Sequence, residues 1–300
     1  MTLERPNIEK MHGYTPGEQP AGANVIKLNT NENPYPPGPA VAAALQHINL
    51  ASLRRYPPPL ASGFREAAAQ LHGVSVDNII ATNGGDELLR LALTTFVDSA
   101  DTIVVTSPSY SLYPVLAEIQ ACKLQELALN EDWSMPAQFG ATLQRLQAKL
   151  CILVNPHAPT GALLSAQYLS QLADEFSGLL LIDEAYVDFV DPELDYNSIP
   201  LIRQHDNVLI LRTLSKGYSL AGLRFGYGLG APAVVSPMLY KTRDSYNTDL
   251  LSQQLATAAI TDQDYARGNC SKVRQSRAQL ATDLATLGMP ALPSQTNFLL

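Results

Sequence analysis

The sequence has few cysteines and no long apolar run. Its three cysteines, Cys122, Cys151 and Cys270, are far apart and show no C-x-x-C spacing, which predicts neither a disulfide framework nor a zinc site. No window reaches the roughly 18 apolar residues that a membrane span needs, and the N-terminus lacks a basic segment followed by an apolar one. These absences predict a cytoplasmic protein with neither export nor membrane anchoring.

Charged residues are also sparse, at 16% of the chain, and acidic residues outnumber basic ones. Twenty Lys and Arg against 28 Asp and Glu give a formal net charge of -8, whereas a general nucleic-acid surface needs clustered cations. The five histidines are scattered without paired carboxylates. The sequence therefore predicts no nucleic-acid partner and no metal, and its 46% hydrophobic content suits an enzyme-sized globular protein.

Short apolar runs alternate with stretches of helical period along most of the chain. The predicted strands are Ile79–Ala81, Thr102–Thr106, Lys149–Val154, Leu179–Ile182 and Val208–Leu211. The predicted helices are Phe64–Leu71, Leu88–Val97, Tyr110–Ile119, Thr142–Lys149, Ser165–Phe176 and Tyr265–Leu287. This alternation predicts an α/β fold with a three-layer α/β/α large domain around a mostly parallel sheet.

The two ends of the chain differ from the middle. The first forty residues are rich in Pro, Gly and Asn, which predicts an extended arm with turns. Near the other end, Pro290 and Pro293 open a new segment that ends in a strand-like run, Asn297–Leu300. We therefore expect an arm over 1–40, a large domain over 41–260, and the start of a small α+β domain over 261–300.

A lysine lies just beyond one of the buried strands. Lys216 follows Val208–Leu211, at the strand end where open α/β sheets place their ligands. A lysine there can form a Schiff base with a carbonyl, while Ser215 and Arg224 offer a hydroxyl and a fixed cation suited to a phosphate. An aldehyde that carries a phosphate would use all three groups.

Two other strand ends carry groups with matching chemistry. Gly85 and Asp86 stand at a helix start, where free backbone N–H groups favour an anion, although Asp86 could be a simple helix cap. Asp183 directly follows an apolar strand, where a carboxylate needs a partner such as a protonated pyridine nitrogen. A surface turn is the alternative for Asp183.

Three tyrosines are candidates for contacts with a flat ring or its substituents. Tyr110 could stack on a ring, Tyr186 could reach a ring hydroxyl, and Tyr56 beside Pro57 could reach a neighbouring surface, including a second subunit. For each of them ordinary packing or a turn is the alternative. The sequence alone does not separate these readings.

Seven motifs, in their order along the chain, resemble the fold-type I aminotransferases that use pyridoxal phosphate (PLP), with the histidinol-phosphate aminotransferases as the nearest branch. The motifs are Leu28–Pro34, Arg55–Pro57, Asn83–Glu87, Pro108–Tyr110, Asn155–Gly161, Asp183–Tyr186 and Arg212–Arg224. Seven motifs in the family's order are far more specific than any one of them. The resemblance implies a seven-stranded sheet, a homodimer, and transfer of an amino group between histidinol phosphate and 2-oxoglutarate, the oxidised partner of glutamate.

The resemblance also implies a role for each matched residue. Lys216 would hold PLP and act as the acid and base of the reaction, with Asp183 at the pyridine nitrogen. The remaining cofactor contacts would come from Gly85, Asp86, Tyr110, Tyr186, Ser215, Arg224 and, from the other subunit, Tyr56. The substrate would lie near Tyr14, Asn33 and Asn297.

Two departures from the family pattern stand out. Ala158 occupies the position of an asparagine that bonds the cofactor's ring hydroxyl, so Tyr186 carries that bond alone or Asn155 or His157 compensates. Family members also continue past the segment at Asn297 with further small-domain elements, among them an arginine for the substrate carboxylate.

Other functions are possible within the same fold, namely those of an aromatic or broad-range aminotransferase or a threonine-phosphate decarboxylase. A catalytically impaired PLP-binding protein is the alternative of another class.

Overall fold

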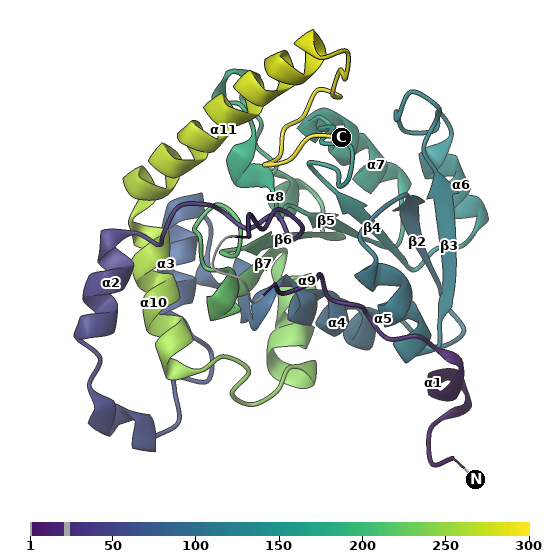
Figure 1. Cartoon of the computed structure of the whole chain (residues 1–300). Helices are drawn as coiled ribbons and strands as arrows, with labels where there is room; N and C mark the ends of the chain where they lie inside the picture. Colours follow the sequence, from purple (N-terminus) through teal and green to yellow (C-terminus); the bar gives the residue numbers. More distant parts are fainter. Residues whose placement is uncertain (1, 21–24) are drawn as a thin grey trace.

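The structure is a computed structural model that describes residues 2–20 and 25–300, and its centre is one seven-stranded sheet (Figure 1). The sheet order is β1-β7-β6-β5-β4-β2-β3. The strands are β1 (Ile79–Thr82), β2 (Thr102–Ser107), β3 (Lys123–Ala128), β4 (Leu150–Val154), β5 (Leu179–Asp183), β6 (Val208–Thr213) and β7 (Gly226–Gly230). Only β7 runs antiparallel to its neighbours, β1 and β6. The predicted mostly parallel sheet is confirmed.

Helices cover both faces of this sheet and give the predicted three layers (Figure 1). In the described residues they are α1 (Pro6–Lys10), α2 (Pro39–Gln46), α3 (Ser62–His72), α4 (Gly84–Phe96), α5 (Leu112–Gln120), α6 (Phe139–Arg145), α7 (Ala166–Glu175), α8 (Leu201–Gln204), α9 (Pro232–Pro237), α10 (Leu250–Thr261) and α11 (Gln263–Thr286). One core contains buried residues of α2, α3, α6, α7, α8 and α10, and the other contains those of α4, α5 and α9.

The central strands supply side chains to both cores in turn. On β5, Leu180 and Ile182 belong to the core with α7, whereas Leu179 and Leu181 belong to the core with α4 and α5. Successive strand residues point to opposite faces, so a strand with helices on both sides is apolar throughout. This explains why the inner strands were visible in the sequence as continuous apolar runs.

Two strands were absent from the sequence-based prediction. β3 is an edge strand of mostly exposed residues in which only Leu124 and Leu127 are partly buried, so it does not resemble a buried strand. β7 is glycine-rich because its start packs against the start of α4: a Cβ on Gly226 would lie 2.7 Å from the carbonyl carbon of Gly84. β3 was therefore not predicted because it is polar, and β7 was not predicted because it is rich in glycine.

The predicted helices are present, with small differences at their ends. α6 begins and ends earlier than the predicted range 142–149, because the chain turns at Gln147, which has a φ of 50°. The helix predicted at Tyr110 begins two residues later, at Leu112. These differences move no predicted site residue to another face of the sheet.

The N-terminal arm is extended, as predicted, apart from the short helix α1. The side chains of Arg5 and Asn7 donate to the carbonyl oxygens of Ile119 and Glu118 at the end of α5, at 3.0 and 2.7 Å. Further along, Tyr265 donates to the carbonyl oxygen of Pro36 at 3.1 Å, which attaches the arm to α11. The arm thus crosses the molecule between α5 and α11 (Figure 1).

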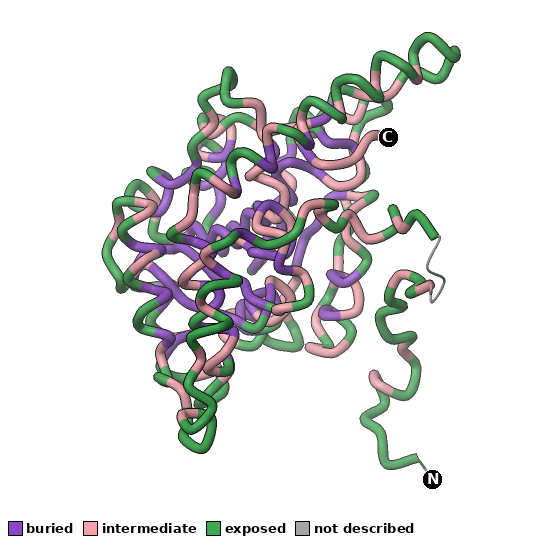
Figure 2. The backbone as a smooth tube through the Cα atoms, turned by 60° about the vertical axis from the view of Figure 1, so that its left-hand side comes forward, coloured by how far each residue is buried: buried purple, intermediate pink, exposed green. Residues whose placement is uncertain are grey.

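The C-terminal segment follows the long helix α11, whose outer end projects from the molecule and is largely exposed (Figure 2). The prediction of a strand at Asn297–Leu300 is wrong: these residues form no ladder, and Leu292 N–H donates to the carbonyl oxygen of Leu300 at 2.9 Å. The segment returns to the large body, where Gln295 N–H donates to the carbonyl oxygen of Gly161 at 2.8 Å. The division into domains at residues 40 and 260 stays a prediction.

Candidate active site

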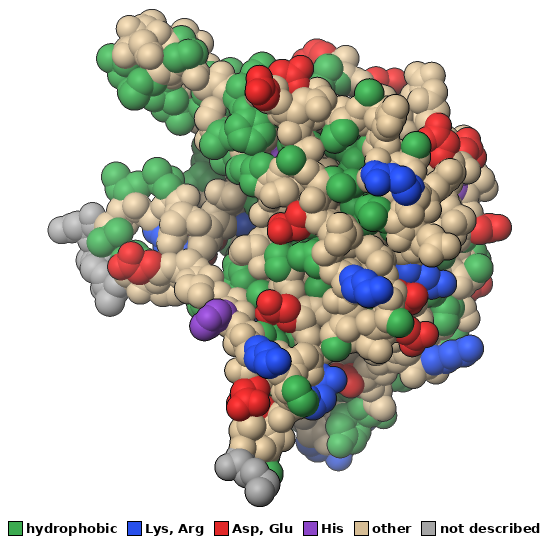
Figure 3. Space-filling view, turned by 90° about the vertical axis from the view of Figure 1, so that its right-hand side faces the viewer, with side chains coloured by type: hydrophobic (Ala, Val, Ile, Leu, Met, Phe, Trp, Pro, Cys, Tyr) green, Lys and Arg blue, Asp and Glu red, His purple; other side chains and the backbone are tan. Residues whose placement is uncertain are grey.

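The candidate residues gather at one edge of the sheet. Parallel strands end at the same edge, so Asp183 at the end of β5 and Lys216 after β6 lie close together. Because β7 is antiparallel, it starts where the parallel strands end, and Arg224 just before it joins the same edge. Figure 3 shows, at its left edge, a recess between the arm and the projecting end of α11, and the face toward the viewer carries interspersed charges of both signs.

Lys216 is partly buried beneath the arm. Its Nζ donates to the carbonyl oxygen of Thr30 at 2.7 Å and lies 5.7 Å from the centre of the Tyr186 ring. Burial lowers the pKa of the Lys216 amine to about 8, although the carboxylate of Glu32 acts in the opposite direction. A substantial fraction of the amine is therefore uncharged near pH 8 and can act as a nucleophile or a base.

Asp183 is a buried carboxylate, 5% exposed, held only by neutral donors. Its Oδ2 accepts from the hydroxyl of Tyr113 at 2.8 Å and its Oδ1 from the Ala185 N–H at 3.1 Å. No Lys, Arg or His within the described ranges forms an ion pair with it. Burial raises its pKa to about 6, so the site would be stabilised by a cation beside this carboxylate.

Tyr186 faces the same space from the segment after β5. Its hydroxyl accepts from Asn31 Nδ2 of the arm at 3.1 Å, and its ring packs edge-on against Phe298 with centres 5.0 Å apart. Burial raises the pKa of the Tyr186 hydroxyl, so it stays protonated. With Asn31 as its donor, the phenol keeps its own proton free for an acceptor in the site.

A second group of candidate residues, near the start of α4, consists of Arg224, Asp86 and Tyr110. An Arg224 guanidinium nitrogen lies 3.3 Å from Asp86 Oδ2, and the Tyr110 hydroxyl lies 3.4 Å from Asp86 Oδ1. Asp86 is therefore an ion-pair partner and forms no side-chain cap of α4, which contradicts the simple reading as a helix cap. Gly84 has a φ of +76°, and a Cβ there would lie 2.6 Å from the guanidinium. The guanidinium can move away, but the positive φ is a conformation that residues with a Cβ rarely adopt, so the backbone here favours glycine.

Ser215 follows β6 and is buried. Its Oγ is 2.9 Å from Thr213 Oγ1, which also accepts from the Ser215 N–H at 3.2 Å. The predicted phosphate ligands Ser215 and Arg224 thus follow β6 and precede β7, on either side of one turn. Arg224 lies beside the N-terminus of α4, where N–H groups of the first turn favour an anion.

The three predicted substrate residues belong to the N-terminal arm or contact another residue of it. Tyr14 packs edge-on against Tyr110 with ring centres 6.0 Å apart. Asn33 Nδ2 donates to the carbonyl oxygens of Lys216 and Gly217 at 3.0 and 3.5 Å, so this amide anchors the arm to the lysine loop. Asn297 Nδ2 donates to Asn31 O at 2.9 Å, and its buried Oδ1 has no partner among the described residues.

Tyr56 stands apart from the other candidates. Its side chain is 79% exposed and stacks on Tyr246, with ring centres 4.4 Å apart and an angle of 13° between the planes. No hydrogen bond joins Tyr56 to the site in the described part of this chain. The aromatic pair is a surface feature of this chain.

The turn after β4 excludes one of the two compensations considered for Ala158. The side-chain amide of Asn155 is engaged in donating to Tyr196 at 2.8 Å and to the carbonyl oxygen of Leu164 at 3.1 Å. Asn155 is therefore not available to the site. His157 Nδ1 bonds Thr160 Oγ1 at 2.8 Å, and its buried Nε2 has no partner in the described residues.

An ion pair next to Asp183 in the chain stabilises the end of β5. Arg212 on β6 contacts Glu184 through two nitrogens at 2.9 Å, and Glu184 also accepts from Tyr196 at 2.8 Å. Because Glu184 directly follows Asp183, this network fixes the chain at the end of β5. Sequence reasoning missed this pair and Tyr113, although the spacing of three residues between Tyr110 and Tyr113 placed both near one helix start.

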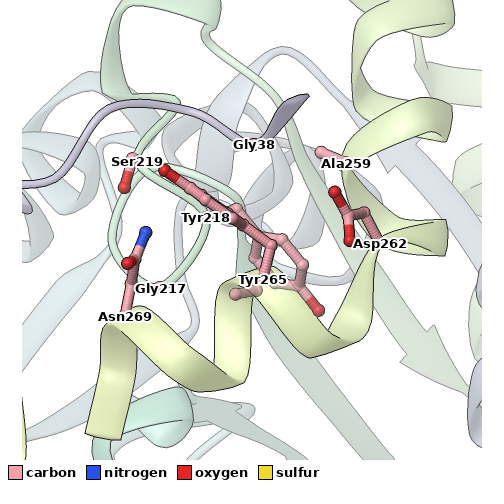
Figure 4. Close-up of a pocket in the computed structure, with 9 residues that line it drawn as sticks. Gly38, Gly217, Tyr218, Ser219, Ala259, Asp262, Tyr265 and Asn269 are labelled. Carbon is pink, nitrogen blue, oxygen red and sulfur yellow. The ribbon is translucent and has the colours of Figure 1, made fainter. Parts of the chain in front are cut away.

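Two cavities lie beside the site without containing Lys216. Figure 4 shows Tyr265 and Asp262 among the residues around a space of about 10 Å³ under Gly38, which is room for about one water. A polar crevice of about 390 Å³ is lined by Arg212, Tyr196 and residues of α3, α8 and α11. Within the described ranges no three His, Cys, Asp or Glu residues are arranged to hold a metal, and no helix is long and apolar enough to cross a membrane.

Comparisons with known proteins identify the family. The family model for class I and II aminotransferases matches residues 23–300. The chain belongs to the class I and II aminotransferases. Histidinol-phosphate aminotransferase 1 of Nostoc sp. is 44% identical to this aminotransferase over 297 residues, which cover 99% of the chain and 82% of the relative.

Two further comparisons agree. The histidinol-phosphate aminotransferase of Geotalea daltonii is 42% identical over 98% of this aminotransferase and 82% of the relative. The crystal structure of histidinol-phosphate aminotransferase from Sinorhizobium meliloti in complex with pyridoxal-5'-phosphate has a TM-score of 0.89 and 26% identity, and it covers all of this aminotransferase and 82% of that chain. The fold-type I resemblance predicted from the seven motifs is thus confirmed.

Proposed function

We propose that this aminotransferase uses PLP to transfer an amino group between histidinol phosphate and 2-oxoglutarate. The observation that carries the substrate assignment is 44% identity, across 99% of the chain, to a relative of that name. The cofactor assignment rests in addition on a PLP complex of a neighbour with a TM-score of 0.89. The site then supplies the chemistry that such a transfer needs.

The residues present fit PLP. Asp183 is a buried carboxylate without a cationic partner in the described ranges, which suits a protonated ring nitrogen. Ser215, Arg224 and the backbone of Gly85 and Asp86 would hold the phosphate. When bound, PLP withdraws electrons from the substrate carbon that carries the amine.

Lys216 is the proposed catalytic residue. Its lowered pKa allows the neutral Nζ to accept a proton from the substrate Cα and to return it later. The carbonyl oxygen of Thr30 fixes the direction of Nζ, and Asn33 fixes the backbone that carries the lysine. In this geometry the arm orients the base, which refines the substrate role expected of Asn33.

Tyr186 is the proposed donor to the ring hydroxyl of the cofactor. Ala158 offers only a methyl group, and the Asn155 amide is engaged elsewhere. Asn31 leaves the Tyr186 proton free, so the phenol can donate where the family's asparagine is absent. Tyr110 is the proposed stacking partner of the ring.

The proposed assembly is a homodimer in which Tyr56 reaches the phosphate of the partner's site. Its exposed position, outside the site of its own chain, supports this role. Sedimentation of Tyr56→Phe and wild-type protein, together with PLP titration, checks it. A fully active monomer would contradict the proposal.

The central experiment follows the visible absorbance of bound PLP. The purified wild type should be coloured with PLP, and each amino donor should bleach the colour in a half-reaction. Histidinol phosphate should react at least about tenfold faster than phenylalanine, since a site that binds the substrate's phosphate discriminates strongly against a substrate that lacks it. It should also react faster than threonine phosphate, which has the phosphate but lacks the imidazole ring. A colourless wild type contradicts the cofactor, and equal rates with phenylalanine contradict the substrate assignment.

A further inference from the structure

Tyr113 is a buried phenol with one hydrogen-bond partner in the described structure, the carboxylate of Asp183. The side chain is 0% exposed, and its hydroxyl lies 2.8 Å from Asp183 Oδ2. Its ring packs edge-on against Tyr110 with centres 5.5 Å apart. Packing alone accounts for the ring, but the hydroxyl requires a separate explanation.

We infer that Tyr113 is a positioning residue whose O–H holds Asp183 as an oriented carboxylate for the ring nitrogen of the cofactor. This inference rests on the proposed function. Oδ2 takes the phenol and Oδ1 takes the Ala185 N–H, so the rotation of the carboxyl group about its last bond is fixed. Each carboxylate oxygen has a second lone pair, which leaves acceptor capacity for the cofactor.

The phenol also offsets the cost of burying the charge. Burial is the largest influence on Asp183 and raises its pKa, whereas the bond from Tyr113 lowers it. The other titratable groups that face Asp183 are Asp86 at the start of α4, Glu184 after β5, and the phenols of Tyr110 and Tyr186. Asp86 and Glu184 both raise the pKa of Asp183, whereas the side-chain hydrogen bond from Tyr113 favours the ionised form.

Tyr113→Phe removes only the hydroxyl and keeps the ring in the core. In the apoprotein, the carboxyl signal of Asp183 can be followed by ¹³C NMR and assigned by its absence in Asp183→Asn. Its titration midpoint should rise by about one pH unit in Tyr113→Phe, because a donor to the ionised form is lost. An unchanged midpoint would overturn the inference.

A matched control separates this effect from a general loss of a buried hydroxyl. Tyr227 is also buried, at 2% exposure, and its hydroxyl lies 3.0 Å from His72 Nε2, outside the site. Tyr227→Phe should leave the midpoint of Asp183 where it is in the wild type. A shift of equal size in both variants would show that Tyr113 has no special role.

Binding of PLP by the same apoproteins tests the link to the cofactor. Tyr113→Phe should weaken binding by about 10- to 100-fold, the range expected for a hydrogen bond to a charged group. Added to Asp183→Asn, it should cause no further loss. Wild-type protein that binds no PLP refutes the proposed function, whereas tight binding by the wild type and Tyr113→Phe alike refutes only the role of Tyr113.

A second variant keeps the test decisive if Tyr113→Phe does not fold. The double variant Tyr113→Phe/Asp183→Asn lacks the buried charge as well as its donor. It should unfold at the same denaturant concentration as Asp183→Asn, because the hydroxyl acts through the carboxylate. A double variant that is also unfolded would show that Tyr113 serves packing alone and would overturn the inference.

Discussion

The two sides of the candidate site are built in different ways. Asp183, Ser215 and Arg224 stand at strand ends and are fixed by the sheet and its two cores. Thr30, Asn31 and Asn33 belong to the part of the arm over residues 25–38, which has neither helix nor strand and is joined to Lys216 and Tyr186 by individual hydrogen bonds. The strand side sets the electrostatics of the site, and the arm side sets the orientation of its lysine.

The largest expected effect comes from Lys216, where the two sides meet. Lys216→Ala should lower kcat for transamination by about a thousandfold or more and abolish the visible absorbance of covalently held PLP. Stopped-flow absorbance with histidinol phosphate measures both. The control is Lys149→Ala, an exposed lysine before β4 at the other end of the strands, which should retain full activity. Turnover near the wild-type rate in Lys216→Ala would remove the lysine from the mechanism.

On the strand side, Asp183 should make the free energy of unfolding depend on pH. The pKa of Asp183 is raised from 3.8 to about 6 in the folded apoprotein, so the fold favours the protonated form. Its contribution to stability is complete below pH 4 and is lost as the pH rises to 6, by about 3 kcal/mol in total. Urea unfolding of wild type and Asp183→Asn across this range should show the difference growing with pH. Parallel curves would contradict a buried ionised Asp183.

Substitution of a glycine on the strand side should also lower the stability of the fold. In Gly226→Ala the new Cβ would lie 2.7 Å from the Gly84 carbonyl carbon and 2.8 Å from the Gly85 nitrogen. Because these are backbone atoms, relief requires a shift of β7 or α4, and we expect a loss of about 1–3 kcal/mol in the free energy of unfolding. Gly222→Ala has open space around its Cβ and is the control. Equal stability of both variants would disprove the tight contact.

The arm side should show the opposite balance, with a small effect on stability and a larger one on catalysis. Asn33→Ala removes the bonds to the carbonyl oxygens of Lys216 and Gly217 and should cost about 1 kcal/mol of unfolding free energy. Its kcat should fall about tenfold, because the base loses its support. Asn29→Ala, whose amide bonds Glu18 O within the arm, is the control. A larger stability loss in Asn33→Ala than in Gly226→Ala, or an unchanged kcat in Asn33→Ala, would erase the distinction between the two sides.

The sequence predicted the strand side well because its signals are local. Runs of three to six mostly apolar residues marked β1, β2, β4, β5 and β6, and the polar residue after each run marked the edge of the sheet. It missed β3 and β7 because one is polar at an edge and the other is rich in glycine. It also predicted a strand at Asn297–Leu300, where the described chain provides no neighbouring strand to pair with.

The sequence by itself determined the α/β class, the family, and the reactive groups Lys216, Asp183 and Arg224, since these depend on residue type and on order along the chain. Only the tertiary structure decided their partners: Tyr113 for Asp183, Asn31 for Tyr186, and Asp86 for Arg224. Those contacts join residues 70, 155 and 138 positions apart. No local pattern encodes such pairs, because they exist only once the sheet has brought the strand ends to one edge and the arm has been laid across them.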